Sequence, residues 1–311
     1  MVKVVFIMDN LSYINGIAYS GNCYHLLRDF DVMQAFRKFI FWTLFLFLFS
    51  SVSYTQSDRF AWNEGEELIY KVKWGFLRLG TLKIQVLDPL QIDDQKIFHI
   101  RLYLDSNPML FFVNMHSIYD TFIDEDLRPY MHLAQEKIDN IDYRSTHYLN
   151  YRDSTLYSQI INLQDSTQNW SDTIRFDQPL YDGISMTYYA RATTENVRRD
   201  TLLSYFGDKH GNVLINFRGK QRSPFNRWAK EQDHLYFVDG NIMMVGIAGL
   251  TGPFMGWFSA NPQRIPLRAQ LKVFLGNVHV ELEQTSQVNV HTLNQDENIQ
   301  KVRAEFLRHA Y

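Results

Sequence analysis

Cysteine is nearly absent from this chain of 311 residues, since Cys23 is the only one. Everything after it therefore lacks disulfides and thiol chemistry. An excess of basic residues is missing as well, because 31 Lys and Arg stand against 34 Asp and Glu. A protein that binds nucleic acid needs a basic face, so this balance argues against a nucleic-acid partner.

Motifs of common catalytic sites are missing too. There is no Gly-x-Ser-x-Gly elbow, no His-Glu-x-x-His, no paired-Cys motif and no phosphate-binding Gly-Lys-Ser/Thr. Zinc sites need three or four converging ligands, and no two histidines stand at ligand spacing. We expect His99, His132 and His147, each in a strand-like segment, to face solvent or to be hydrogen-bonded. The sequence predicts no catalytic set, no metal and no cofactor, and does not favour an enzyme.

One long apolar run indicates export. Phe39–Phe49 is interrupted only by Thr43, follows the basic pair Arg37-Lys38 and leads into a stretch of small residues. A basic start, an apolar centre and a small-residue exit make up a secretory signal peptide. The run is shorter than the roughly 20 apolar residues that span a bilayer. We expect cleavage after Thr55, with an uncleaved membrane anchor and a buried core helix as alternatives.

The position of this signal predicts the organisation of the chain. Signals lie at the N-terminus, so we interpret residues 1–32 as a leader from a start codon assigned too far upstream. Residues 33–55 are then the signal peptide, 56–285 a single exported β-rich domain and 286–311 a C-terminal tail. The expected location is periplasmic or secreted, without a stable membrane span after cleavage.

Alternating apolar and polar residues, the pattern of half-buried strands, dominate from Glu66 onward. Leu68, Tyr70 and Trp74 share one face of the first predicted strand. The same pattern predicts strands at 82–86, 98–104, 116–123, 130–138, 142–151, 155–163, 213–218, 234–238, 242–245, 267–275 and 278–284. Tight turns are predicted at Asp239-Gly240 and Gly276-Asn277. The glycine-rich stretch 246–256 is predicted to be a loop.

One segment has helical spacing instead. Ile184, Tyr188 and Val197 recur near helical intervals after Asp182, a residue type that caps helix N-termini. We expect the longest helix of the domain here, over 183–197, and a short helix over 297–309. The predicted fold is mainly β: a large curved antiparallel sheet, an open or partial barrel, with one main helix packed against it.

Several segments carry a resemblance to a known family. They are the opening Gly-Glu-Glu-Leu-Ile-Tyr from Gly65 to Tyr70, the helix start Asp182 to Arg191, the segment Trp257 to Pro266, and the strand, Gly-Asn-Val turn and Glu-Leu from Lys272 to Leu282. With these motifs the chain resembles the bacterial domain of unknown function 3108 over about Phe60 to Gln284. The resemblance implies an exported, mostly β domain with no established activity, so it supplies no catalytic residue.

Five residues are candidates for ligand binding. Trp257, Ser259 and Arg264 are motif positions, and Tyr70 and Trp74 are aromatic residues of the first predicted strand. A purely structural role is the competing interpretation. Trp and Pro would then fix the start of a strand, and Arg264 would bind backbone carbonyls or a carboxylate.

These observations predict an exported envelope protein with a non-catalytic binding or envelope-maintenance role, directed at an apolar ligand or a partner protein. One alternative is a hydrolase acting on envelope polymers, and another is a structural partner of an outer-membrane assembly. An aromatic pocket would favour ligand binding, whereas a converging Ser, His and carboxylate would favour the hydrolase. A flat apolar patch would favour the assembly partner.

Overall fold

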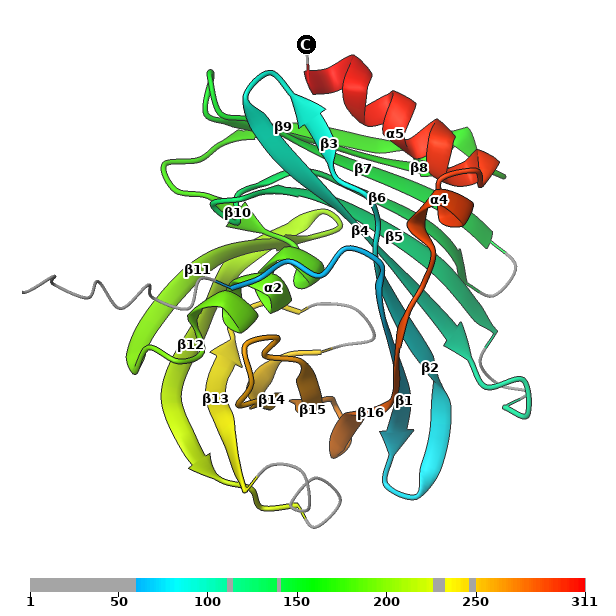
Figure 1. Cartoon of the computed structure of the whole chain (residues 1–311). Coiled ribbons are helices and arrows are strands. Elements are labelled where there is room, and N and C mark those ends of the chain that lie inside the picture. Colours follow the sequence, from blue (N-terminus) through cyan, green and yellow to red (C-terminus); the bar gives the residue numbers. More distant parts are fainter. Residues whose placement is uncertain (1–59, 111–113, 139–140, 226–232, 246–249, 311) are drawn as a thin grey trace, which may run out of the picture. The chain divides into compact units, whose positions relative to one another are not determined.

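A computed structural model of the protein describes residues 60–110, 114–138, 141–225, 233–245 and 250–310 (Figure 1). These residues lie within one compact unit, Asp58–Tyr311. The predicted leader and signal peptide lie outside the described residues. The strands are β1 (Glu66–Trp74), β2 (Leu77–Val86), β3 (Leu90–Ile92), β4 (Gln95–Ser106), β5 (Met115–Asp124), β6 (Pro129–Ile138), β7 (Ile141–Asn150), β8 (Thr155–Asn162), β9 (Trp170–Arg175), β10 (Leu180–Tyr181), β11 (Arg198–Phe206), β12 (Lys209–Arg222), β13 (His234–Ile242), β14 (Gly252–Ser259), β15 (Pro266–Lys272) and β16 (Asn277–Gln287).

All these strands belong to one sheet, whose order is β10-β11-β12-β13-β14-β15-β16-β1-β2-β4-β5-β6-β7-β8-β9, with β3 beside β4. Neighbours pair antiparallel, apart from the short parallel pair β10–β11. The last strand, β16, pairs with the first along Glu66–Trp74. Because β9 and β10 do not pair with each other, the sheet is open. The predicted fold class, a large curved and unclosed antiparallel sheet, is confirmed.

Helix α2 (Gly183–Thr193) lies inside the curl of the sheet, between strands β4 and β12 in Figure 1. Its Ile184 and Tyr188 belong to a buried cluster with residues of β1, β2, β4 and β5. Its Ala190 belongs to a second cluster, with residues of β12, β13 and β14. A helix with apolar contacts on opposite sides is a buried helix, so α2 forms part of the core.

The curl brings the two ends of the sheet over one another. Tyr205 of β11 lies against His147 of β7, with ring centroids 4.8 Å apart, and against His132 of β6 at 6.2 Å. Sheets of many strands twist and curl in this way instead of staying flat. The result is an open spiral in which β10 and β11 face the inner side of β6 and β7.

A second helix, α5 (Glu297–Ala310), covers the outer face of the sheet, and the short helices η1 (Ser166–Gln168) and α4 (Val290–Leu293) lie in connections. Phe306 of α5 stacks on Phe122 of β5 with ring centroids 4.1 Å apart. The helix expected in the tail is therefore present, and its 14 residues exceed the 11 of α2. Among the described residues of the predicted domain 56–285, α2 is the longest helix, as predicted. It ends at Thr193 and not at Val197, at the β-branched pair Thr193-Thr194.

Two local predictions also need correction. Asp239-Gly240 lies within β13 and not in a turn; glycine is required there because a Cβ on Gly240 would lie 2.0 Å from the carbonyl oxygen of Leu214. The region predicted as a glycine-rich loop already contains strand β14 from Gly252 onward. By contrast, Gly276 has a φ of +80° in the turn from β15 to β16, as predicted.

Candidate functional site

The family-like segments meet at α2. Arg191 of the helix donates to both carboxylate oxygens of Glu66 in β1, at 2.7 and 2.9 Å, and to the carbonyl of Gln263 at 2.9 Å. Both charged side chains are buried. The guanidinium also lies over the rings of Phe60 and Tyr188, 5.0 and 4.9 Å from their centroids. This two-point ion pair joins the start of β1 to the end of α2.

The β14–β15 turn is held by candidates Ser259 and Arg264. The Ser259 hydroxyl donates to Asn261 Oδ1 at 2.5 Å and accepts from the Ile265 amide at 2.7 Å. Arg264 has a φ of +46° and a buried side chain, which donates to the Ala192 carbonyl at 2.9 Å and pairs with Glu195 at 2.8 Å. Their polar atoms shape the turn and bind the end of α2, so neither residue is presented to a ligand.

The three aromatic candidates separate into two places. The Tyr70 hydroxyl donates to the Pro266 carbonyl at 3.0 Å, and burial raises the pKa of this phenol well above its usual value. Trp257 packs against the buried cluster that contains Tyr70 and the α2 residues Ile184 and Tyr188. Its ring lies edge-on to Phe225, with centroids 5.0 Å apart. Trp74 stands apart at the far end of β1, where it is 38% exposed and donates to the Leu275 carbonyl at 2.7 Å.

The space around α2 is filled by aromatic side chains of the chain itself. Trp62, from the segment before β1, stacks between Phe98 and Tyr188, with ring centroids 4.0 and 5.0 Å away. Phe60 packs edge-on against Trp62 at 5.3 Å. Aromatic rings of this size each bury about 150–250 Å². Aromatic rings of the protein itself therefore fill the space between α2 and β4 on the inner side of the sheet.

A buried charged network lies beneath α5. Asp120 of β5 accepts from Arg101 at 2.7 and 2.9 Å and lies 2.6 Å from His99 Nε2. Arg303 of α5 donates to His99 Nδ1 at 3.2 Å, so the imidazole carries its proton on the Asp120 side. Burial raises the pKa of Asp120, but the bonds from His99 and Arg101 outweigh it and hold that pKa low. Burial lowers the pKa of His99.

A second buried network caps the start of α2. The Asp182 carboxylate accepts from the amides of Ile184 and Ser185 at 2.8 and 3.1 Å and from the Ser185 hydroxyl at 2.8 Å. The Thr121 hydroxyl donates to the same carboxylate at 3.0 Å and lies 2.9 Å from His132 Nδ1. Hydroxyl, imidazole and carboxylate thus meet here. Ser185 and Thr121 are fully buried and already bonded, so this set caps a helix and offers no reachable nucleophile.

Three histidines were predicted to face solvent or to be hydrogen-bonded, namely His99, His132 and His147. All three are buried and hydrogen-bonded. His147 Nδ1 lies 2.9 Å from the Ser158 hydroxyl, and burial lowers the pKa of His147 to about 3. The solvent-facing alternative was wrong for His99, His132 and His147. Period-2 alternation fails as a guide here because both faces of these strands are covered, one by α2 and β11 and the other by α5.

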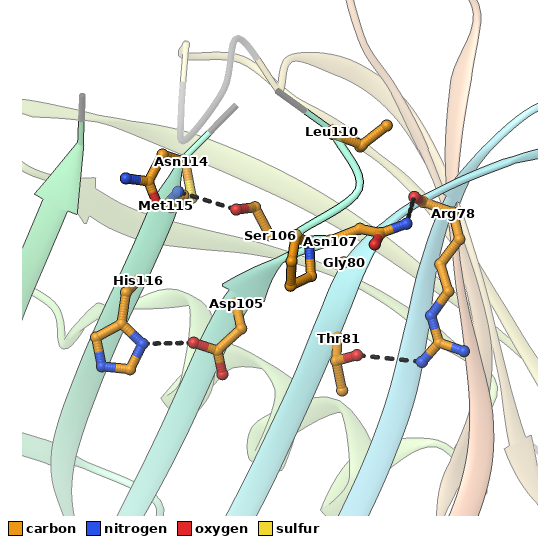
Figure 2. Close-up of a pocket in the computed structure, with 11 residues that line it drawn as sticks. Arg78, Gly80, Thr81, Asp105, Ser106, Asn107, Leu110, Asn114, Met115 and His116 are labelled. Carbon is orange, nitrogen blue, oxygen red and sulfur yellow. Dashed lines mark hydrogen bonds and ion pairs between the residues drawn. The ribbon is translucent and has the colours of Figure 1, made fainter. Parts of the chain in front are cut away.

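A pocket of about 820 Å³ lies where β2, β4 and β5 end (Figure 2). Its walls hold Arg78, which donates to Thr81 at 3.1 Å, and Asn107, which donates to the Arg78 carbonyl at 3.0 Å. Across the pocket His116 is hydrogen-bonded to Asp105, and both are more than half exposed. The lining combines these polar and charged groups with Pro108, Leu110 and Met115, so it offers both hydrogen-bonding and apolar contacts to a ligand or a partner protein.

In the described part of the chain, no group of three or more His, Cys, Asp or Glu side chains is arranged to hold a metal ion. No helix among those residues combines the length and the apolar character needed to cross a bilayer.

Sequence reasoning missed the two residues at the centre of the α2 contacts. Glu66 and Arg191 are 125 positions apart, so no local pattern joins them. The signal that could have found them was present, because each is a charged residue inside a family-like segment.

The chain was compared with known proteins. Comparison with curated proteins finds no match. A β-barrel-like protein of domain of unknown function DUF1849 from Brucella abortus is 11% identical, with 72% of this chain and 98% of that chain covered and a TM-score of 0.48. A Bacteroides fragilis protein with a YmcC-like fold is 9% identical, with 74% and 99% covered and a TM-score of 0.25. Residues 69–283 match the family model described as protein of unknown function (DUF3108), and the chain belongs to that family.

Proposed function

We propose that the chain is exported and acts as a non-catalytic binding domain of the cell envelope, with a partner protein as its ligand. The observation that carries this proposal is the filled interior: Trp62 stacks between Phe98 and Tyr188, where a carried apolar molecule would have to lie. Binding then falls to the outer surface, where the pocket beside Arg78 and His116 offers hydrogen-bonding groups.

The buried ionisable groups support the non-catalytic part of the proposal. Arg191, Arg264 and Asp182 hold the two ends of α2, and His99 and Asp120 bind each other beneath α5. Catalytic acids and bases need contact with substrate, and these groups are bonded within the core. A scaffold role in an envelope assembly is one form of the same binding function.

Native mass spectrometry of the protein purified from its own envelope tests the proposal. A protein-sized mass should co-purify with the wild-type chain, and replacing Arg78 and His116 with Ala should release it. Arg218→Ala, which removes an arginine on another strand, is the matched control. A bound molecule of lipid size, retained in the Arg78→Ala/His116→Ala variant, would overturn partner binding in favour of a carrier.

A lipophilic fluorescent probe provides a second readout. Trp62→Ala should open a cavity between Phe98 and Tyr188 and raise probe fluorescence above that of the wild type. Equal fluorescence with both proteins, well above that of the probe alone, would mean that the wild-type interior already admits an apolar ligand.

A further inference from the structure

Exposed apolar side chains gather along one rim of the sheet, which we name the apolar rim. It consists of the connections β1–β2, β4–β5, β6–β7, β8–β9, β13–β14 and β15–β16, which lie at the same end of their antiparallel strands. Of the twelve large apolar residues that are exposed in the described chain, nine lie here: Trp74, Phe76, Met109, Ile141, Leu163, Met243, Val245, Phe274 and Leu275. Scattered exposed apolar residues need no explanation, but this segregation does.

The opposite rim has a different character in the part that the structure describes. Its turns carry Asp93, Asp94 and the acidic run Asp124–Asp126. Among its described residues the exposed large apolar side chain is Val197. The two ends of the strands therefore differ in their exposed large apolar side chains, although the apolar rim also carries acidic residues such as Asp105, Asp142 and Asp165.

Two neighbouring turns form the centre of the apolar rim. Phe76 in the β1–β2 turn is 100% exposed, and Phe274 in the β15–β16 turn is 101% exposed. The turns are joined by the 2.7 Å hydrogen bond from Trp74 Nε1 to the Leu275 carbonyl, and by the pairing of β1 with β16. The β1–β2 hairpin projects at the lower right of Figure 1. Phenylalanine rings held fully in water at the tips of adjacent hairpins are costly unless a ligand covers them.

The charge and area of these two turns indicate what covers them. Residues 74–79 and 272–278 contain Arg78 and Lys272 and no Asp or Glu. Arg78 is paired with Glu283 at 2.8 Å, so Lys272 is the cation that these turns offer to an anionic surface. Phe76 and Phe274 are fully exposed, whereas Leu275 is 65% and Trp74 38% exposed. Together they present the area of about three side chains, roughly 450–750 Å², less than the about 800 Å² per partner of a stable protein interface. Protruding Phe and Leu side chains, an adjacent Trp and a flanking Lys match the interface of an anionic bilayer.

We propose that the turns carrying Phe76 and Phe274 dock the protein onto an anionic lipid surface. The two Phe rings and Leu275 enter the boundary between headgroups and acyl chains. Trp74 lies at headgroup depth, and Lys272 contacts lipid phosphates. This docking goes beyond the proposed partner binding and does not depend on it, because the lipid contacts use the tips of the hairpins and not the pocket.

Vesicle co-sedimentation tests the proposal with residues 58–311, a separate compact unit that contains the whole sheet and excludes the apolar run of residues 39–49. We expect the protein to sediment with vesicles of phosphatidylcholine and phosphatidylglycerol, and less with phosphatidylcholine alone. Phe76→Ser/Phe274→Ser should lower the partition coefficient by about tenfold or more. Val197→Ser, on the opposite rim and 75% exposed, should stay within about twofold of wild type. Circular dichroism checks that each variant folds.

Two results would overturn lipid docking. One is equal sedimentation of the wild type and of Phe76→Ser/Phe274→Ser with the anionic vesicles, including the case in which neither sediments. The other is lipid-free self-association of the wild type that the double substitution abolishes, which would assign these turns to a second copy of the chain. Charge reversal in Lys272→Glu should weaken sedimentation with the anionic vesicles and leave that with phosphatidylcholine unchanged.

Discussion

The two main helices cover opposite faces of the same sheet and are held in different ways. Helix α2 is enclosed by the curl, and both of its ends are buried, at Asp182 and Thr194. Helix α5 lies on the outer face, burying Ile299, Val302 and Phe306 on one side while Glu297 remains exposed. The family segment 69–283 includes α2 and ends before α5.

This difference shows when a helix needs charged anchors. Helix termini leave amides and carbonyls without intrahelical partners, and water satisfies them only where the terminus is exposed. In α2 the Asp182 carboxylate accepts the first amides and Arg264 donates to the Ala192 carbonyl. Helix α5 also has a carboxylate N-cap, because Asp296 accepts from the amides of Asn298 and Ile299 at 2.8 and 3.2 Å. Its first residue, Glu297, is exposed, so this end does not require the buried partners that α2 has. The family-like motifs therefore mark the anchors of the enclosed helix.

Breaking the anchor of α2 should have the largest effect. Arg191→Met leaves the Glu66 carboxylate buried without its partner, which we expect to lower the free energy of unfolding by about 3–5 kcal/mol. Glu66→Leu/Arg191→Met removes both charges and should recover most of that loss. Urea denaturation measures both. Equal losses in the single and double variants would show that packing, and not the unpaired charge, sets the cost.

A smaller loss is expected from the outer helix. Phe306→Ala removes the ring stacked on Phe122, and the cavity should cost about 3 kcal/mol. Leu307→Ala, one position along and 37% exposed, should cost less than about 1 kcal/mol. Comparable losses from the two substitutions would argue that α5 does not depend on its apolar face.

The smallest change in the free energy of unfolding, counted per pH unit, should come from acidification. Burial lowers the pKa of His147 to about 3, whereas the unfolded imidazole titrates near 6.5. Below about pH 6.5 the unfolded chain binds a proton that the folded chain does not, so this group lowers the free energy of unfolding by about 1.4 kcal/mol per pH unit until its folded pKa is reached.

His147→Gln removes this contribution, so between pH 6.5 and 5 the variant should lose less stability than wild type. His210→Gln, at an exposed position, is the control and should follow the wild-type pH dependence. If the His147→Gln and wild-type curves run parallel, the buried imidazole does not contribute to acid sensitivity.

Local pattern predicted most of the strands and the start of α2. Alternation identified β1, β4 and β5 because each has an apolar face against the core, and Asp182 acts as the N-cap that its residue type suggested. Strand β14 escaped because its glycines pointed to a loop. Gly256, however, lies within β14. Glycine suits this position because a Cβ there would lie 3.0 Å from the Val238 side chain.

The candidate site was less accessible to sequence reasoning. The contacts of the motif positions Ser259 and Arg264 depend on partners in α2 more than 60 residues away or on the shape of one turn. Trp74 was chosen as an inward-facing aromatic residue, whereas it ends β1 beside Leu275. Period-2 alternation assigns faces and cannot tell where along the strand the core ends.

The ladder between β1 and β16 also has a consequence for folding. Strands β1 to β9 and strands β11 to β16 form two meanders, built from pairs of strands close in sequence. The β1–β16 pair joins them and brings together residues about 200 positions apart, such as Tyr70 and Leu282. Closing so long a loop costs entropy before its contacts form. We therefore expect the two meanders to assemble first. The pairing of β1 with β16, the longest-range contact of the sheet, should then limit the folding rate.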